Sequence, residues 1–336
     1  MTRLDTIREC FNYNAWARHR LLDMAAGTSE DQLDKPFEMG CGSLRETLRH
    51  LYRAEHVWYA RFLGRNPPEL TDGRDLAPVS DFAKAFRRIH DHRTAWLDEL
   101  DDATVRQPIT FDHEDETYTL PLDQLMLHVC NHGTHHRAQA LNMLRHVGVK
   151  IRDIDYIDMR HGRHDDPPPD FSVAMIRDYY AYNDWARDTV LDAASGLTDD
   201  DLDRPFEMGP GTLRKTLLHI RDAEQWWLEN WHSDGEDHFT ELDAETTMDE
   251  LRELHSETAQ RRDAVLARMT DMDLKRRVWC NPSPGETYTF RLGETMFQLC
   301  NHGTHHRAQV LNLLRHLGAP PPGLDYARWL RTGTNR

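Results

Sequence analysis

The sequence predicts an all-α protein made of two four-helix bundles in tandem. The chain has 336 residues, about twice the roughly 150 residues of a typical domain, which favours two domains. Blocks of sequence from the first half return in the second half, and each half contains long segments whose apolar residues recur at helical spacing. Helices of about twenty residues that each bury one face favour an antiparallel bundle.

The two halves are copies of one sequence, related by a nearly constant shift along the chain. Between them, residues 161–170 contain three consecutive prolines, which cannot continue a helix. We therefore expect copy 1 at residues 1–160, a stiff linker at 161–170 and copy 2 at residues 171–336. The repeated blocks are Tyr13–Arg18 with Tyr182–Arg187, Pro36–Gly40 with Pro205–Gly209, and Cys130–Gln139 with the identical Cys300–Gln309.

Two helices are predicted at the start of the first copy. Apolar residues at helical spacing predict the first helix over residues 6–26. Ser43 is expected to begin the second helix, and Glu46 three residues later predicts a capping box. The second copy has Thr212 and Lys215 at these positions, so only the hydroxyl half of the box is expected there.

Two more helices are predicted after a stop at Pro67-Pro68. The third helix is expected over residues 80–100. Residues 116–120 favour a strand, and a fourth helix over residues 121–146 is closed by Gly148. The repeat predicts the same order of elements in the second copy.

Composition narrows the classes of function. A formal net charge of −16 would repel a phosphate backbone, so we expect no nucleic-acid partner. Five cysteines without a CxxC pair and the lack of a signal-peptide pattern favour the reducing cytoplasm. No apolar run approaches the roughly 20 residues that span a bilayer, so we expect a soluble protein without a membrane partner.

Histidines one helical turn apart predict a metal site in each copy. His132 and His136 on the fourth helix are about 40° apart in azimuth and about 6 Å apart along the axis, so both can reach one ion. A third ligand must come from another helix, and His50 on the second helix is the candidate. Neutral imidazoles suit zinc, nickel, copper or iron, and three protein ligands leave a position for water or substrate. The same positions are histidine in the second copy, at His219, His302 and His306.

A single pair of histidines four residues apart on a helix more often binds no metal. The repetition of the pair in the second copy is what favours a metal site here. His56 and His128 are not doubled, because Gln225 and Gln298 stand at the matching positions. The trio is doubled, on the apolar side of its helices. Neither copy has lost a ligand, so we expect two working sites rather than one active copy and one scaffold copy.

Other doubled residues compete for a role at the site. His135 is an alternative ligand, or a residue that contacts substrate, and Gln139 lies one turn beyond His136 where it could bind a metal-bound water. The candidate catalytic residues are therefore His135, Gln139, His305 and Gln309.

Most of the remaining doubled residues are expected to have structural roles, and Glu38 with its counterpart is the exception. The amide of Asn14 is expected to fix a loop or a histidine tautomer, and Arg137 to make a salt bridge or a surface contact. Glu55 is not expected to act as a catalytic acid, and Cys130 is read as a small buried residue. Glu38 and its counterpart Glu207 are possible substrate contacts in the loop before the second helix.

One set of residues in each half carries a family resemblance. In the first half these residues are Tyr13-Asn14, Trp16, His50, Trp58 and Asn131-His132-x-x-His135-His136-Arg137-x-Gln139. With them, each half resembles the DinB/YfiT metalloproteins, a bacterial damage-inducible family, although Ala138 and Ala308 replace the family's usual glycine. The resemblance implies a four-helix bundle with a long connection between helices 2 and 3, and a divalent ion held by one histidine of helix 2 and two of helix 4. It carries those ligands onto His50, His132 and His136 and onto His219, His302 and His306.

The resemblance also implies partners and an activity. Members of the family often dimerise, which implies that the two bundles pack as an intramolecular pseudo-dimer. Characterised relatives use low-molecular-weight thiols, as thiol S-transferases or as a thiol-dependent isomerase. We therefore expect a metal-dependent thiol S-transferase that joins a small-molecule thiol to an electrophile. We expect one metal ion per domain, with zinc or nickel favoured over iron. The alternative is a non-catalytic metal-binding or stress-response module.

Overall fold

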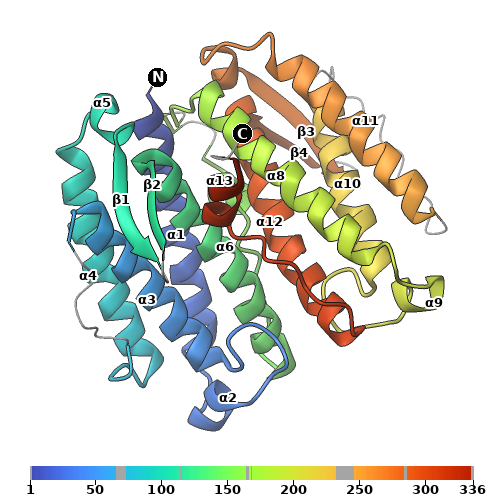
Figure 1. The fold of residues 1–336 in the computed structure, drawn as a ribbon, viewed down its shortest axis with the longest axis horizontal. Helices are drawn as coiled ribbons and strands as arrows, with labels where there is room; N and C mark the ends of the chain where they lie inside the picture. The colour runs from blue at the N-terminus through green and yellow to red at the C-terminus, as the bar shows by residue number, and fades with distance from the viewer. Residues whose placement is uncertain are drawn as a thin grey trace. The chain divides into compact units, whose positions relative to one another are not determined.

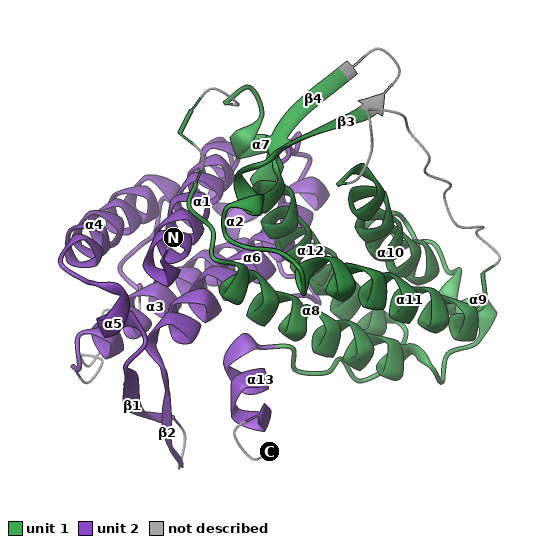
Figure 2. Ribbon diagram, turned by 90° about the horizontal axis from the view of Figure 1, so that it is seen from above, with its two compact units in different colours: residues 1, 155–324 green, residues 2–154, 325–336 purple. Residues whose placement is uncertain are grey.

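The computed structural model describes residues 2–65, 73–113, 116–163, 166–167, 169–231, 246–283 and 286–333. The chain folds into two compact units, shown in Figures 1 and 2. The N-unit comprises residues 2–154 and 325–336, and the C-unit comprises residues 155–324. Both are mostly helical, which confirms the predicted fold class, and among the described residues each has one two-stranded hairpin.

Four long helices build the bundle of the N-unit. Helices α1 and α3 each pack against both α4 and α6, so the four surround one core. The predicted helices are all present, with small shifts at their ends. They are α1 (Arg3–Ala25), α3 (Leu44–Phe62), α4 (Val79–Asp98) and α6 (Leu122–His146).

The helix that begins after Ser43 shows which part of the predicted capping box forms. The Ser43 side chain accepts a hydrogen bond from the backbone N–H of Glu46 at 3.2 Å. The return contact from the Glu46 carboxylate was predicted wrongly, because that carboxylate pairs with Arg49 at 2.5 Å instead. Thr212 caps the equivalent helix in the same one-sided way, accepting from the N–H of Lys215 at 3.1 Å.

Short elements complete the N-unit. The hairpin joins α5 to α6, and its second strand coincides with the predicted strand at residues 116–120, whereas the first strand was not predicted. The short elements are α2 (Glu30–Asp34), α5 (Asp102–Val105), β1 (Pro108–His113), β2 (Glu116–Pro121) and α13 (Tyr326–Gly333).

The C-unit repeats this architecture. Its long helices α8 and α10 each pack against both α11 and α12. Of the predicted linker, residues 164, 165 and 168 lie outside the described part of the chain. The elements are α7 (Tyr156–Arg160), α8 (Val173–Ala194), α9 (Asp199–Leu202), α10 (Leu213–Asn230), α11 (Met248–Leu266), η1 (Asp273–Lys275), β3 (Arg277–Ser283), β4 (Glu286–Arg291) and α12 (Leu292–His316).

The last segment of each repeat belongs to the unit that is built on the other repeat. Helix α7 follows the first bundle in the sequence but packs on α12 in the C-unit, and α13 follows the second bundle but packs on α6 in the N-unit. Tyr156 in α7 and Tyr326 in α13 are fully buried there. The Tyr326 hydroxyl also donates a hydrogen bond to Gln124 at 2.5 Å. The two units thus exchange equivalent segments (Figure 2).

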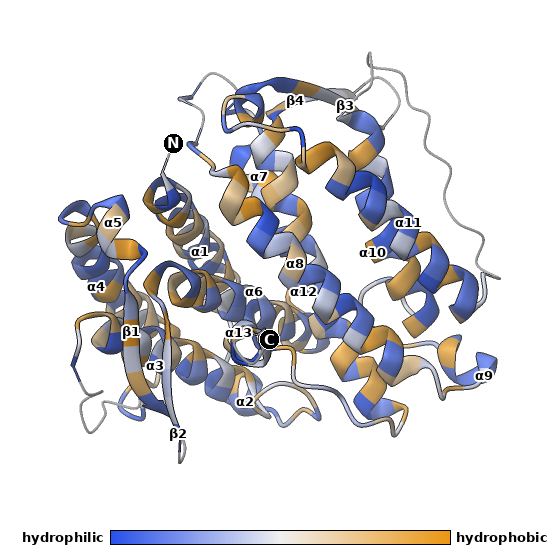
Figure 3. Cartoon of the chain, turned by 45° about the horizontal axis from the view of Figure 1, so that its top comes forward, coloured by the Kyte–Doolittle hydropathy of each residue, from blue (hydrophilic) through white to orange (hydrophobic). Residues whose placement is uncertain are grey.

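The long helices are amphipathic, with separate hydrophilic and hydrophobic faces in Figure 3. The most buried of the long helices, α6 and α12, also carry two predicted metal ligands each. Among the described residues, no helix has both the length and the apolar character that crossing a membrane requires.

Candidate metal centres

The predicted ligands of the first copy converge in the N-unit. His50 comes from α3, and His132 and His136 come from successive turns of α6. The Nε2 atoms of His50 and His132 are 3.0 Å apart. The ring centroid of His136 is 4.4 Å from those of both other rings. We call this group of three histidines the N-centre.

The equivalent residues converge in the C-unit with nearly the same geometry. The Nε2 atoms of His219 on α10 and His302 on α12 are 3.1 Å apart. The centroid of the His306 ring is 4.5 Å from that of His219 and 4.4 Å from that of His302. One donor atom from each of the three side chains lies within 4.8 Å of the other two. We call these three histidines the C-centre.

Burial favours the neutral form of most of the predicted ligands. Burial, followed by the neighbouring imidazoles, lowers the pKa of His132, His136 and His306 well below its usual value. Burial and His302 lower the pKa of His219 to about 4. Because a metal binds the unprotonated ring nitrogen, these four rings present the form that can act as a ligand.

One glutamine in each unit selects the tautomer of a predicted ligand. The Oε1 atom of Gln139 can only accept a hydrogen bond, so Nδ1 of His136 carries the proton and donates to it at 2.8 Å. The Nε2 lone pair of His136 is then free to bind a metal. Gln309 holds Nδ1 of His306 in the same way, at 2.9 Å.

The same glutamines connect the two remaining candidate residues to the centres. The amide nitrogen of Gln139 donates to Nε2 of His135 at 3.1 Å. Gln309 and His305 repeat this contact at 3.1 Å. His135 and Gln139 therefore lie behind His136 in one chain of hydrogen bonds, and a direct part for either in a reaction stays a prediction.

Cys41 was missed by the sequence reasoning. Its Sγ atom lies within 4.8 Å of a ring nitrogen of His50 and of one of His136. Burial raises the pKa of its thiol to about 11, so the metal-free side chain is protonated at neutral pH. Cys41 is not doubled, because Pro210 stands at the equivalent place in the second copy, so the repeat gives no signal for it.

Asp155 was also missed, and it supports the C-centre. Its carboxylate accepts a hydrogen bond from Nδ1 of His302 at 2.8 Å and one from the amide of Gln298 at 2.8 Å. Burial would raise the pKa of Asp155, but the contact with His302 lowers it below its usual range. A carboxylate on Nδ1 fixes the ring so that Nε2 faces the centre. The sequence signal was the pair Asp155-Tyr156, which returns as Asp325-Tyr326.

A buried polar network lies behind the N-centre. The Glu55 carboxylate accepts hydrogen bonds from Asn14 at 3.1 Å and from Arg93 at 2.8 Å, and it pairs closely with Arg18. Arg137 is 2% exposed and donates to Asn14. Asn14 thus bridges two charged groups and contacts no histidine of the centre through these bonds. The surface contact considered for Arg137 was wrong. Glu55, which was not expected to act as a catalytic acid, is a buried ion-pair partner of Arg18 and Arg93.

The C-unit has a related network of different composition. Arg262 pairs with Asp184 and with Glu224, each at 2.6 Å, and Arg307 donates to Asn183 at 2.6 Å. These residues and His302 line a cavity of about 20 Å³, enough for one water. Asp184 has no acidic counterpart in the first copy, where Ala15 stands, so the two networks are not chemically identical.

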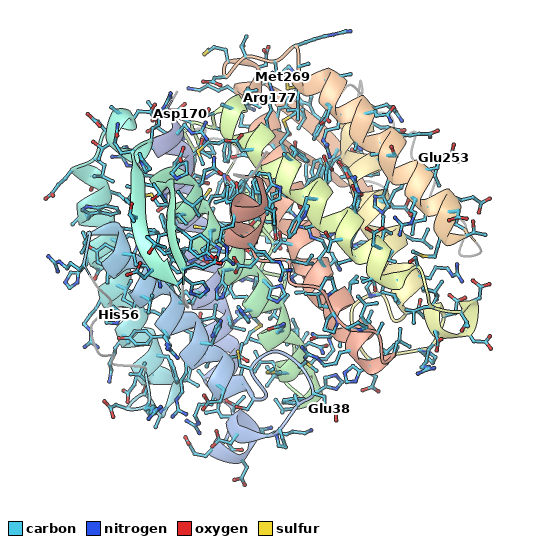
Figure 4. All side chains as sticks on the ribbon, viewed as in Figure 1. Glu38, His56, Asp170, Arg177, Glu253 and Met269 are labelled. Carbon is cyan, nitrogen blue, oxygen red and sulfur yellow. The ribbon has the colours of Figure 1, made fainter. Side chains whose placement is uncertain are left out.

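Glu38, labelled in Figure 4, is exposed in the loop between α2 and α3. Glu207 occupies the same place in the C-unit and is also exposed. Their contact with a substrate stays a prediction.

The donor sets fit a divalent transition ion. Three neutral imidazoles from two helices are a common ligand set for such ions, and hard cations such as magnesium prefer oxygen ligands instead. In the C-centre, donor atoms of all three rings lie within 4.8 Å of one another. In the N-unit, the donor atoms that lie within 4.8 Å of one another belong to Cys41, His50 and His136, and Nε2 of His132 lies 3.0 Å from that of His50. In each centre at least one ring is oriented through Nδ1 by a neighbour.

Comparison with known proteins identifies the family of both halves. The sequence model of the DinB family matches residues 1–168 and again residues 172–335. Protein DinB of Bacillus subtilis (strain 168) is 20% identical over 154 residues, which cover 44% of this chain and 88% of that protein. One relative thus corresponds to about half of this chain. The chain belongs to the DinB family and carries two of its domains in tandem.

Proposed function

We propose that the chain is a metal-dependent transferase that joins a low-molecular-weight thiol to an electrophile. The observation that carries the proposal is the convergence of three imidazoles in each unit, with Nε2 atoms 3.0 and 3.1 Å apart in the closest pairs. The histidines would hold zinc or nickel, or iron as the less favoured choice. When bound, such an ion lowers the pKa of a coordinating thiol, so that a thiolate is available at neutral pH.

The residues of the chain would hold the reacting groups in place. Gln139, Gln309 and Asp155 fix the histidine rings through Nδ1, which keeps the Nε2 atoms directed at the centre. In the transfer, the thiol loses its proton to solvent, its sulfur forms a bond to the electrophilic carbon, and the leaving group departs with the electron pair of the broken bond. No cysteine of the chain is needed as nucleophile.

Transfer to a thiol suits the site better than hydrolysis. Metallohydrolases of the HExxH type place a free carboxylate beside the ion as a general base. Here Asp155 is engaged by His302 and Gln298, and Glu55 is engaged by Asn14, Arg18 and Arg93.

The test is turnover by the metal-loaded full chain with bacillithiol, mycothiol, glutathione or cysteine and a model electrophile. We expect metal-dependent product formation with at least one thiol. His136→Ala and His306→Ala should each lower the bound metal by about one equivalent per chain, measured by elemental analysis of untagged protein. His19→Ala is the matched control, because this side chain is 63% exposed on α1, and it should keep both equivalents. Unchanged metal content in either of the first two variants contradicts the ligand assignment.

The second candidate is a metal-binding module without turnover. The position of Cys41 beside His50 and His136 favours it for the N-centre, because a protein thiolate can fill the position that a substrate would need. In that case metal removal lowers the melting temperature, while no thiol and no electrophile in the panel is consumed.

A further inference from the structure

The loops before α3 and before α10 share a backbone conformation but carry different residues after their first glycine. The N–H of Phe37 donates to the carbonyl of Gly42 at 2.8 Å, and Phe206 and Gly211 repeat this bond at 2.7 Å. Gly40 has a φ of +51° and its counterpart has a φ of +50°. Cys41 lies between Gly40 and Gly42 in the first loop, and Pro210 lies between the two equivalent glycines of the second loop.

The loop of the N-unit is held against the centre by close packing. A Cβ atom at Gly40 would lie 2.8 Å from Oε1 of Gln139, the same atom that binds His136. The glycine therefore lets the loop approach the ligand shell closely, and the next residue along the chain is Cys41. Its Sγ lies within 4.8 Å of ring nitrogens of His50 and His136.

Cys41 is also the accessible thiol of the chain. Its side chain is half-buried, whereas Cys10, Cys130, Cys280 and Cys300 are buried. A half-buried thiol beside two imidazoles is placed to bind a metal. Among the described residues, the groups that could hold an ion include no other cysteine.

We infer that the two centres are different metal sites: the N-centre is closed by Cys41 as a fourth ligand, and the C-centre keeps an open position. Four-coordinate sites built from cysteine and histidine are typically structural, whereas sites with three protein ligands bind water or substrate in the fourth position. Thiolate also favours softer ions, such as zinc, over harder ones. Pro210 offers no donor atom, so the C-centre would be the one that takes the small-molecule thiol.

This inference rests on the proposal that both histidine trios bind metal, and it names where the substrate thiol binds. It replaces the expectation of two working sites with one closed metal site in the N-unit and one open site in the C-unit. The difference arises from one added ligand in copy 1, and neither copy has lost a histidine.

Cobalt(II) is the probe, because a thiolate bound to cobalt gives a charge-transfer absorption in the near ultraviolet that imidazole ligands do not give. The full chain loaded with two equivalents should show the band of one thiolate per chain. Cys41→Ser should lose the band and keep its helical circular dichroism, while Cys130→Ala, the matched control, should keep it. Binding of cobalt should also protect Cys41 from a thiol-modifying reagent.

Two further measurements separate the centres. Pro210→Cys should double the charge-transfer band, because it places a thiol in a loop with the backbone of the first. Added free thiol should bind one cobalt per chain in the wild type and two in Cys41→Ser. Two bound cobalt ions without a thiolate band in the wild type would overturn this inference and leave the proposed function standing. A chain that binds no cobalt at either centre would overturn both.

Discussion

Glu55 shows how one buried residue links stability to pH. Burial would raise its pKa, but Arg18 and Arg93 lower it from 4.5 to about 2. A carboxylate with a depressed pKa contributes stability that is present above its unfolded pKa and is lost as the pH falls through its folded pKa. This contribution amounts to about 3 kcal/mol and disappears between about pH 4.5 and pH 2.

We therefore expect Glu55→Gln to lower the free energy of unfolding at pH 7 by about 3 to 5 kcal/mol, because Arg18 and Arg93 stay buried without their partner. The deficit relative to the wild type should shrink as the pH falls from 4.5 toward 2. Denaturant unfolding of the metal-free chain at a series of pH values measures both effects. Glu46→Gln, an exposed change on the same helix, should shift the free energy by no more than about 0.5 kcal/mol. A deficit for Glu55→Gln that is constant across this pH range would contradict the assignment.

At the residue scale, the histidine trios were predictable because duplication separated them from most other histidines, and helical spacing favoured His132 with His136 over His135, which is also doubled. His56 and His128 have no histidine at the equivalent positions, whereas all three predicted ligands do. The same comparison of the two copies gives no signal for Cys41, because this residue occurs in the first copy alone. Asp155 was not found because its partner, His302, lies 147 positions along the chain, and no helical periodicity relates the two.

At the scale of elements, the loop between α2 and α3 controls how closely Cys41 and Gln139 approach the N-centre. A side chain at Gly40 would meet Gln139 at 2.8 Å and would also be strained by the positive φ. We expect Gly40→Ala to weaken metal binding at the N-centre by tenfold or more, because it displaces the amide that orients His136, an outer-shell partner of the kind whose loss typically costs 10- to 100-fold. Competition with a chelator of known affinity measures the loss.

Gly42→Ala is the control for this experiment. Gly42 has a φ of +90°, but a Cβ atom there would have nothing within 4 Å. Both variants should lose about 1 to 3 kcal/mol of stability through backbone strain, and only Gly40→Ala should lose metal affinity. Equal losses of metal affinity in the two variants would show that strain, and not the collision with Gln139, is responsible.

The long helices were predictable from periodicity and end signals, because their apolar faces and caps are local features. Strand β1 was not, because residues 108–113 gain their order from pairing with β2. Helix α7 was not predicted either. Its five residues are stabilised by packing on α12, which lies in the other repeat. The local signal at its start is short: the N–H of Asp155 donates to the Asp158 carboxylate at 2.9 Å.

At the scale of the whole molecule, the exchange of α7 and α13 supplies each unit with an aspartate from the other repeat. Asp155 accepts from Nδ1 of His302, a proposed ligand. Its counterpart Asp325 lies 3.2 Å from Nδ1 of His128, which is outside the trio. The equivalent carboxylates therefore have different neighbours in the two units.

We expect Asp155→Asn to weaken metal binding at the C-centre by about 10- to 100-fold, because the neutral amide orients His302 less strongly. Asp325→Asn should leave the affinity of the N-centre unchanged. Titration of the metal-free chain with metal in the presence of a competing chelator resolves the two sites. If both variants weaken one site equally, then the carboxylates act through packing of the exchanged segments and not through His302.

The exchange also has a consequence for biosynthesis. Helix α13, which completes the N-unit, follows the entire second repeat in the chain, so a ribosome must translate that repeat before the first unit can be finished. At elongation rates of about 5–20 residues per second, the first bundle waits for roughly 10 to 35 seconds with the α13 surface of α6 uncovered. The N-unit, whose bundle is translated first, is therefore completed only after the bundle of the C-unit has been translated.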